Sequence, residues 1–140
     1  QVIPIINEND TVATAELEGG EIGDNDTLSA EVAVMAKADL LVLLTDIPGL
    51  FTADPRQEQG ATLIPLVTEL TAEMFAAAGG AGPGFGTGGM RTKLEAAKYL
   101  QNHNIDMVIT NGQNPESLYE VVAGQPVGTR FAFHKEEGKA

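Results

Sequence analysis

Two uninterrupted apolar segments constrain the fold of this chain more than any other feature of its sequence. Residues 40–44 read Leu-Leu-Val-Leu-Leu, and residues 106–110 are apolar in their interior. Strands of this kind are typically covered on both faces, as they are in parallel sheets. Segments with the apolar spacing of helices lie between the strands. We therefore expect an α/β domain built in layers around a mostly parallel sheet.

Apolar periodicity and turn residues predict the other elements. We expect further strands at residues 2–6, 63–67 and 129–133, and helices at residues 28–35, 71–78, 90–101 and 117–123. In the first helix, Leu28, Val32 and Met35 are spaced to form one apolar face. Asn114 is expected to cap the last helix. The glycine-rich segment 79–89 is expected to form a long mobile loop.

Composition limits the partners and the chemistry that the chain can use. It carries 20 acidic side chains against 8 Lys and Arg, a formal net charge of −12, and it has no cysteine. Excess negative charge disfavours nucleic acid and anionic membranes, so we expect neither as a partner. The absence of cysteine excludes disulfides, thiolate nucleophiles and cysteine metal sites. No apolar run approaches the ~18 residues of a membrane span.

The glycine-rich segment leads directly into the helix expected from Met90. Two cations, Arg91 and Lys93, then fall in the first turn of that helix. A helix N-terminus already carries partial positive charge, so further cations destabilise it unless an anion lies opposite. Glycine N–H groups can point at phosphate, the usual anion at such a position. The run lacks the spacing of a Walker A motif, so a solvated loop and a phosphate site both remain open.

A second polar cluster, Asp24-Asn25-Asp26, precedes the first expected helix. One of the three serves as an N-cap, and the others could hold Mg²⁺, organise lysines or bind a substrate ammonium group. The two histidines lie at a helix end and near the chain end, which gives no support to a serine–histidine pair. Phosphoryl transfer to a carboxylate fits better, because an acceptor with a pKa of ~4.3 is already ionised at neutral pH. Positioning and charge neutralisation then supply the catalysis.

Four motifs follow one another along the chain, at residues 6–10, 23–30, 43–55 and 86–93. Together they resemble the glutamate 5-kinases, a family within the amino-acid kinase superfamily. The last two motifs occur across the superfamily, whereas Asn-Glu-Asn-Asp (7–10) and Gly-Asp-Asn-Asp (23–26) indicate the glutamate enzymes. The resemblance extends to residues 127–131. It implies a three-layer α/β/α sandwich of the carbamate kinase-like type, here as a partial domain.

The resemblance also implies a role for each motif. Asp10 and Asn25 would bind L-glutamate, and Asp26 would orient the catalytic lysines. Lys93 would stabilise charge on the transferred phosphoryl group. The ATP-binding residues would be Thr45, Asp46, Thr87, Gly88, Gly89, Met90, Arg91, Thr92 and Lys93. The implied reaction converts ATP and L-glutamate to glutamyl 5-phosphate and ADP, the first step of proline synthesis.

Further expectations follow from the same resemblance. It implies Mg²⁺ as a cofactor, a cytoplasmic location, a homo-oligomer and inhibition by proline at the glutamate site. The chain lacks the lysine-bearing phosphate strand with which family members begin, an early serine of the glutamate site, and the C-terminal PUA domain of many members. We therefore expect residues 1–133 to be the C-terminal, nucleotide-binding part of the kinase domain, a fragment inactive alone, and residues 134–140 to be a polar tail or linker.

Two alternatives stay open at this point. The chain could be a non-catalytic nucleotide-binding or regulatory module that kept the fold and lost the chemistry. It could also belong to a kinase of the same fold that acts on another acceptor. The presence of both Lys93 and Asp26 favours the catalytic interpretation, because a module without chemistry has little physical reason to keep a cation there beside a spare acid.

Overall fold

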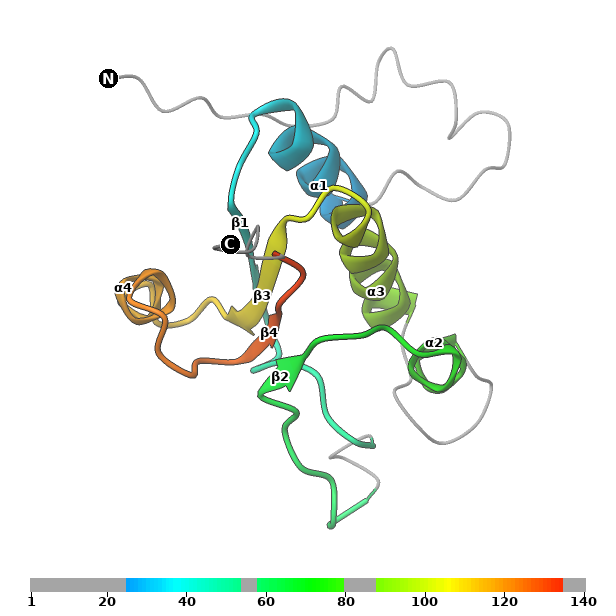
Figure 1. Ribbon diagram of the computed structural model, residues 1–140. Coiled ribbons are helices and arrows are strands. Elements are labelled where there is room, and N and C mark those ends of the chain that lie inside the picture. The colour runs from blue at the N-terminus through cyan, green and yellow to red at the C-terminus, as the bar shows by residue number, and fades with distance from the viewer. Residues whose placement is uncertain (1–24, 54–57, 80–87, 135–140) are drawn as a thin grey trace, which may run out of the picture.

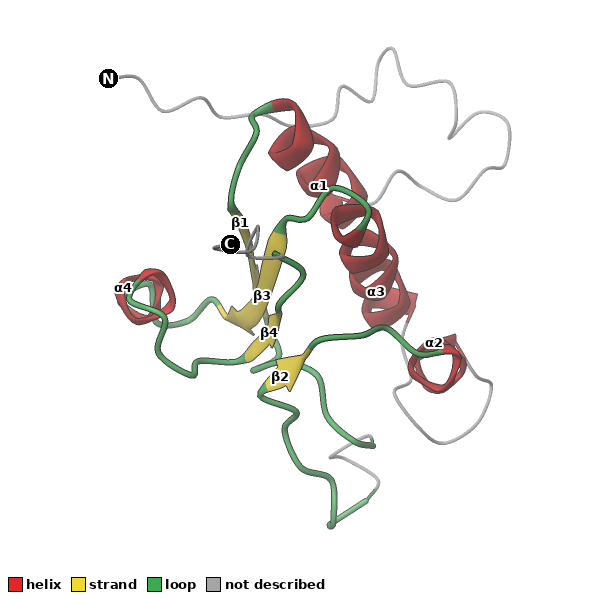
Figure 2. Cartoon of the chain, viewed as in Figure 1, coloured by secondary structure: helices red, strands yellow, loops and turns green. Residues whose placement is uncertain are grey.

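The structure of the protein, a computed structural model, describes residues 25–53, 58–79 and 88–134. Figures 1 and 2 show these residues as four helices arranged around a sheet. The helices are α1 (Asn25–Met35), α2 (Ala72–Gly79), α3 (Gly88–Gln101) and α4 (Ser117–Val122). The strands are β1 (Leu40–Thr45), β2 (Leu66–Val67), β3 (Asp106–Asn111) and β4 (Thr129–Phe131).

The sheet joins two parallel pairs through one antiparallel contact. Its strand order is β1-β3-β4-β2. β1 runs parallel to β3, with Leu40 opposite Asp106 and Thr45 opposite Asn111. β2 runs parallel to β4, and β4 runs antiparallel to β3. The expectation of a mostly parallel sheet is confirmed, and the antiparallel joint in its middle is a feature that periodicity did not predict.

Helices cover both sides of the sheet. Figure 1 shows α1 and α3 together on one side and α4 on the opposite side. The core between the sheet and the first pair of helices contains Leu94 and Leu100 of α3 with Met107, Ile109 and Phe131 of the strands, all fully buried. The described residues therefore have the α/β/α layering expected from the sequence.

Two helix–strand units share one geometry, and this geometry creates the site. α1 leads to β1 through residues 36–39, and α3 leads to β3 through residues 102–105. In each connection one residue is left-handed, Lys37 at φ 53° and Asn104 at φ 54°. Such residues end helices and reverse the chain. Each helix therefore runs back along its strand. Figure 1 shows that α3 begins on the side toward which β1 and β3 run and that α1 begins beside α3.

The face of α1 that packs on the core differs from the apolar face seen in the sequence. Ala30 and Ala33 are buried, whereas Met35 is 82% exposed. The reason is the neighbouring helix: α3 brings its own buried alanines, Ala96 and Ala97, into the same core. Small side chains let two helices approach closely, so the alanine side of α1 is the one that fits.

Helix α3 begins two residues earlier than the sequence suggested. Gly88 and Gly89 are its first residues, not the end of a loop. Lys93 therefore lies in the second turn of α3, and the prediction that placed it in the first turn is wrong. Gly124, at φ +76°, follows α4 as expected. The N-cap of α4 is Glu116, with no capping side-chain hydrogen bond, so the expectation that Asn114 caps this helix is wrong. Asn114 Oδ1 instead accepts a hydrogen bond from the Glu116 N–H in the turn that precedes α4.

Several expectations fall outside the described residues. They include the strand at residues 2–6, Asp10 of the predicted glutamate site, Thr87 of the predicted nucleotide site, and the loop at residues 80–87. Within the described ranges, no helix combines the length and the apolar character that crossing a bilayer requires.

Candidate active site

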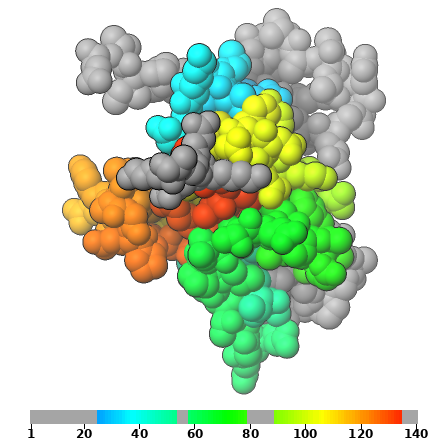
Figure 3. All heavy atoms as spheres, viewed as in Figure 1, coloured from blue at the N-terminus to red at the C-terminus, as the bar shows by residue number. Residues whose placement is uncertain are grey.

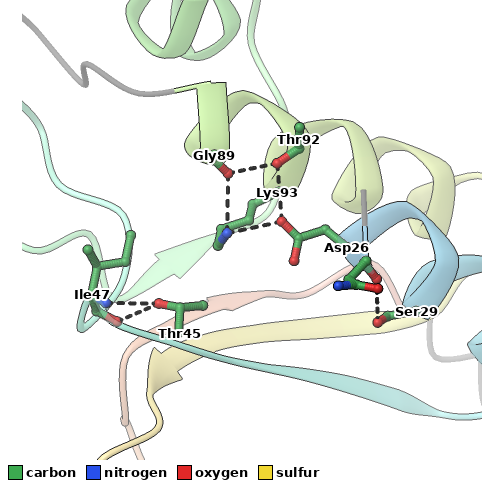
Figure 4. A network of polar contacts seen from close by, with 8 residues as sticks. Asp26, Ser29, Thr45, Ile47, Gly89, Thr92 and Lys93 are labelled. Atoms are coloured by element: carbon green, nitrogen blue, oxygen red, sulfur yellow. Dashed lines mark hydrogen bonds and ion pairs between the residues drawn. The ribbon is translucent and has the colours of Figure 1, made fainter. Parts of the chain in front are cut away.

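The candidate site centres on an ion pair between the first turn of α1 and the second turn of α3. Lys93 Nζ lies 3.0 Å from Asp26 Oδ2, and both side chains are about 15% exposed. Figure 4 shows the two side chains pointing toward one another from the two helices. The partners are 67 positions apart, so the packing of α1 on α3 creates the pair. The structure thus brings together the two residues predicted to be catalytic.

Neighbouring groups of α3 hold the pair in place. Thr92 Oγ1 lies 3.1 Å from Asp26 Oδ2 and 2.9 Å from the Gly89 carbonyl, so its single hydrogen can serve either acceptor. Lys93 Nζ also lies 3.3 Å from the Gly89 carbonyl. An ammonium group has three donors. Among the described residues, Asp26 and Gly89 account for two of the Lys93 donors, which leaves one for a ligand.

The start of α3 adds a second source of positive potential. The first N–H groups of any helix have no intrahelical acceptor, and they carry the positive end of the helix dipole. α3 is 14 residues long and has no acidic residue in its first turn to neutralise that end. Gly88 and Gly89 are the first residues of α3, so their N–H groups belong to this end of the helix. The arrangement therefore favours a negatively charged ligand beside Lys93.

The turn after β1 supplies the other wall of the site. Thr45 Oγ1 accepts a hydrogen bond from the Ile47 N–H (3.0 Å) and lies 2.9 Å from the Ile47 carbonyl, which closes a tight turn. The Gly112 N–H donates to the Thr45 carbonyl at 2.8 Å, and Asn111 Nδ2 lies 3.4 Å from the Asp46 carbonyl. The ends of β1 and β3 are thereby tied together, with Thr45 half-buried and Asp46 exposed.

The remaining predicted nucleotide residues on α3 have different surroundings. Arg91 Nε lies 3.0 Å from Glu95 Oε1, one turn along the helix, and the Arg91 side chain is 57% exposed. Met90 is buried in the core, so its side chain anchors the first turn of α3. A nucleotide-binding role for these two residues stays a prediction.

Asn25, predicted to bind glutamate, is exposed at the start of α1. Its backbone carbonyl accepts a hydrogen bond from Ser29 Oγ at 2.6 Å, a contact in which the Asn25 side chain takes no part. It lies next to Asp26 in sequence, at the same end of α1. The geometry is compatible with a substrate contact beside the ion pair, and this role also stays a prediction.

Thr129 is a polar residue of this region that reasoning from the sequence missed. It begins β4, opposite Ile109 of β3, and it is completely buried. Its hydroxyl contacts the backbone at Leu50 and Ile64, far away in sequence. A threonine at the start of a strand has no unusual spacing, so no local signal could have found this role.

Comparison with known proteins shows to which family this chain belongs. The model of the amino acid kinase family matches residues 1–111, and the chain belongs to this family. A uridylate kinase structure from Archaeoglobus fulgidus has a TM-score of 0.57 and 25% identity, covering 76% of this chain and 46% of that chain. The α/β fold class expected from the sequence is confirmed.

Within this family, the chain is most informatively compared with two curated glutamate 5-kinases. The glutamate 5-kinase of Deinococcus radiodurans is 53% identical over 95% of this chain and 36% of its own length. That of Listeria innocua is 50% identical over 97% of this chain and 50% of its own length. The resemblance to glutamate 5-kinases drawn from the four motifs is thus confirmed. The chain spans about a third to a half of the length of the curated relatives that it matches.

Proposed function

We propose that this chain is the nucleotide-binding part of an enzyme that uses ATP to phosphorylate the side-chain carboxylate of L-glutamate. The product would be glutamyl 5-phosphate, and the reaction would be the first step of proline biosynthesis. Identity of 50–53% to glutamate 5-kinases over almost the whole chain supports the choice of acceptor. The observation that carries the chemistry is the Lys93–Asp26 pair beside the start of α3.

The reaction suits a site of this composition. A glutamate carboxylate oxygen attacks the γ-phosphorus of ATP, and the bond from that phosphorus to the bridging oxygen breaks as ADP leaves. The carboxylate is already ionised at neutral pH, so no base has to remove a proton from it. What the protein must supply is positive charge and N–H donors around the phosphoryl oxygens. Lys93 and the first N–H groups of α3 are groups of this kind.

Asp26 acts in this proposal through Lys93. Its carboxylate holds the ammonium group at 3.0 Å, and the Gly89 carbonyl receives a second donor at 3.3 Å. The third donor is then fixed in direction before any substrate arrives. Preorganised charge of this type stabilises a transition state without the cost of reorienting at the moment of reaction. Asp10 and Asn25 would bind glutamate, and Thr45, Asp46 and residues 87–93 would bind the nucleotide.

We propose that Mg²⁺ enters with the nucleotide. Among the described residues, no group of three or more His, Asp or Glu side chains is placed to hold a metal ion. Mg²⁺ commonly keeps several waters and binds through one or two carboxylates together with substrate phosphates. The exposed carboxylate of Asp46, at the end of β1, is the described side chain best able to join such a set. The metal would shield the phosphate charges during transfer.

The sequence resemblance alone supports the remaining parts of the proposal. They are a cytoplasmic location, assembly into a homo-oligomer and inhibition by proline at the glutamate site. Proline carries the carboxylate and the ammonium group of an amino acid, so it could compete for the groups that bind the same parts of glutamate.

Glutamate-dependent formation of ADP tests the proposal. We expect turnover by the protein as its gene encodes it, and none by the 140-residue chain alone, because the chain spans only part of its relatives. Aspartate and uridine monophosphate serve as control acceptors. Turnover with either control and none with glutamate would contradict the choice of acceptor. Nucleotide binding without turnover on any acceptor would favour a regulatory module, and normal turnover by the isolated chain would refute the assignment of a partial domain.

A further inference from the structure

An arm of the chain projects from the sheet directly after the turn that follows β1. We define the arm as residues 50–53 and 58–64, and its tip is the green projection in the space-filling view of Figure 3. At its base the Ile64 N–H donates to the Leu50 carbonyl at 2.8 Å, and Phe51 forms an antiparallel bridge with Leu63. The arm therefore begins as a short two-stranded ribbon whose two sides leave the body together.

A single hydroxyl group fastens both sides of this ribbon to the sheet. Thr129 Oγ1 accepts a hydrogen bond from the Leu50 N–H at 2.8 Å and donates to the Ile64 carbonyl at 2.7 Å. With the contact between Leu50 and Ile64, these bonds form a closed ring of three residues. Thr129 is 0% exposed and is 79 positions from Leu50. The hydroxyl thus donates its one hydrogen to one side of the arm and accepts a hydrogen bond from the other side.

Two glycines allow the backbones to come this close. A Cβ on Gly49, whose φ is +155°, would stand 2.6 Å from Thr129 Oγ1. A Cβ on Gly128, whose φ is +65°, would collide with the Ile109 carbonyl of β3. Both residues must therefore be small for Thr129 to sit between the sheet and the arm. We call the contacts of Thr129 with Leu50 and Ile64 the clamp, and the two glycines beside it leave the room that these contacts need.

The clamp determines where the turn at residues 45–49 lies. One end of this turn is fixed by the pairing of Thr45 with Asn111, and the other end is fixed where Leu50 meets Thr129. The turn carries Thr45 and Asp46, which the proposed function assigns to the nucleotide pocket. A segment of this length held at both ends has little freedom to shift.

We propose that Thr129 is a positioning residue for nucleotide binding, acting through the turn at residues 45–49. This inference rests on the proposed function, because the proposal makes that turn part of the nucleotide pocket. Thr129 itself has no contact with the nucleotide in this scheme. Removing its hydroxyl would leave the buried Leu50 N–H and the partly buried Ile64 carbonyl without this partner, and the arm would move to satisfy them in water.

The test compares Thr129→Val with Thr129→Ser in the protein as its gene encodes it. Valine keeps the shape and removes the hydroxyl, whereas serine keeps the hydroxyl. We expect Thr129→Val to raise the Kd for MgATP about tenfold and Thr129→Ser to remain within about threefold of wild type. Hydrogen exchange at the Leu50 amide should accelerate in the valine variant only. Val121→Ala is the control, because it opens a cavity at a buried position of α4 that has no part in the clamp.

The control separates positioning from general loss of stability. Val121→Ala should lower the melting temperature at least as much as Thr129→Val yet leave the Kd for MgATP within about twofold of wild type. Gly49→Ala, which disturbs the same contact from the side of the turn, should reproduce the weaker binding if Thr129→Val fails to fold.

The inference would be overturned if wild type binds MgATP and the folded Thr129→Val or Gly49→Ala variant binds it with the same Kd. That result would leave the proposed function intact. No binding of MgATP by wild type would overturn the proposed function and, with it, the nucleotide-positioning role. Exchange at the Leu50 amide would still show whether the clamp holds the arm.

Discussion

Two ion pairs, one at the start of β3 and one between α1 and α3, differ in how fully their carboxylates are used. Asp106, the first residue of β3, accepts hydrogen bonds from Arg130 Nη2 and from the N–H groups of Phe133 and His134, each at 2.8 Å. Both of its carboxylate oxygens are used. Asp26 accepts a hydrogen bond from Lys93 at one oxygen, near which the Thr92 hydroxyl also lies, and among the described residues nothing donates to the second oxygen.

The difference indicates what each carboxylate is for. Asp106 accepts three hydrogen bonds, which fix the end of β4 and the residues that follow it. The Asp26–Lys93 pair keeps an unused carboxylate oxygen and an unused ammonium donor within the described residues, so it can engage a ligand without breaking an existing bond. Buried polar groups that are fully satisfied stabilise a structure. An ammonium donor left unused beside a helix N-terminus is suited to binding an anion, whereas the unused oxygen of Asp26 can only accept a hydrogen bond or bind a cation.

The largest expected effect is a loss of kcat when the cation of the Asp26–Lys93 pair is removed, but not when the cation of the Asp106–Arg130 pair is removed. Lys93→Ala removes a charge that acts mainly on the transition state, so kcat should fall roughly 10²–10³-fold while affinity for ATP changes much less. Steady-state kinetics and equilibrium ATP binding measure the two quantities separately. Arg130→Ala serves as the matched control, because it removes the cation of the other pair and should leave kcat per folded molecule unchanged. A large loss of ATP binding with kcat intact would contradict the role of Lys93.

The next largest effect is a loss of folding stability when Asp106 of the Asp106–Arg130 pair is neutralised. Asp106→Asn removes the charge and places an amide donor opposite Arg130 or the backbone N–H groups. The free energy of unfolding should therefore fall by about 1–3 kcal/mol. Glu31→Gln is the control, since it neutralises an exposed carboxylate on α1. Urea denaturation of the two variants at neutral pH measures the difference. Equal stabilities would show that Asp106 does not hold the end of β4.

The pH dependence of the same variant follows from the pKa of Asp106. Burial raises this pKa, but the His134 N–H, Arg130 and the Phe133 N–H together hold it below its ordinary value of 3.8. A group with a lowered pKa stabilises the fold above its unfolded pKa and loses that contribution as the pH falls through the folded one. The gap in stability between wild type and Asp106→Asn should therefore shrink as the pH is lowered below about 4. A gap that stays constant to lower pH would show that the charge of Asp106 is not responsible.

The parts of the structure that the sequence could predict are those specified by neighbouring residues. Residues 40–44 and 106–110 form strands as their apolar side chains predicted, and the Gly124 position after α4 needs only a local signal. Of the two strands only β3 is buried along its length; in β1 Leu43 is buried and Leu44 is exposed, so the expectation of a buried strand is wrong for β1. The buried face of α1 could not be predicted, because Ala30 and Ala33 are selected by the alanines of α3.

The same limit applies to the site. The glycines and cations at residues 86–93 left a solvated loop and an anion site equally open. The acidic cluster at residues 24–26 suggested a partner for lysines among other roles, and only the resemblance singled out Asp26. Nothing in the spacing of Asp26 and Lys93 reveals that α1 and α3 bring them within 3.0 Å. Thr129 was missed for the same reason, since both of its partners lie more than 60 positions away. Contacts that depend on how elements pack leave little trace in local sequence.

The smallest expected effect concerns Arg91, the cation of the site that differs most from Lys93. Its partner Glu95 lies one turn along α3, and the two side chains are 57% and 46% exposed. Exposed pairs of this spacing contribute about 0.5 kcal/mol or less, so Arg91→Ala and Glu95→Ala should barely change the midpoint of urea denaturation. Nucleotide affinity distinguishes the two variants: if Arg91 binds phosphate, as the resemblance implies, then Arg91→Ala should weaken MgATP binding severalfold and Glu95→Ala should not. Equal affinities in both would remove Arg91 from the nucleotide site and leave Lys93 as the cation on which the proposal depends.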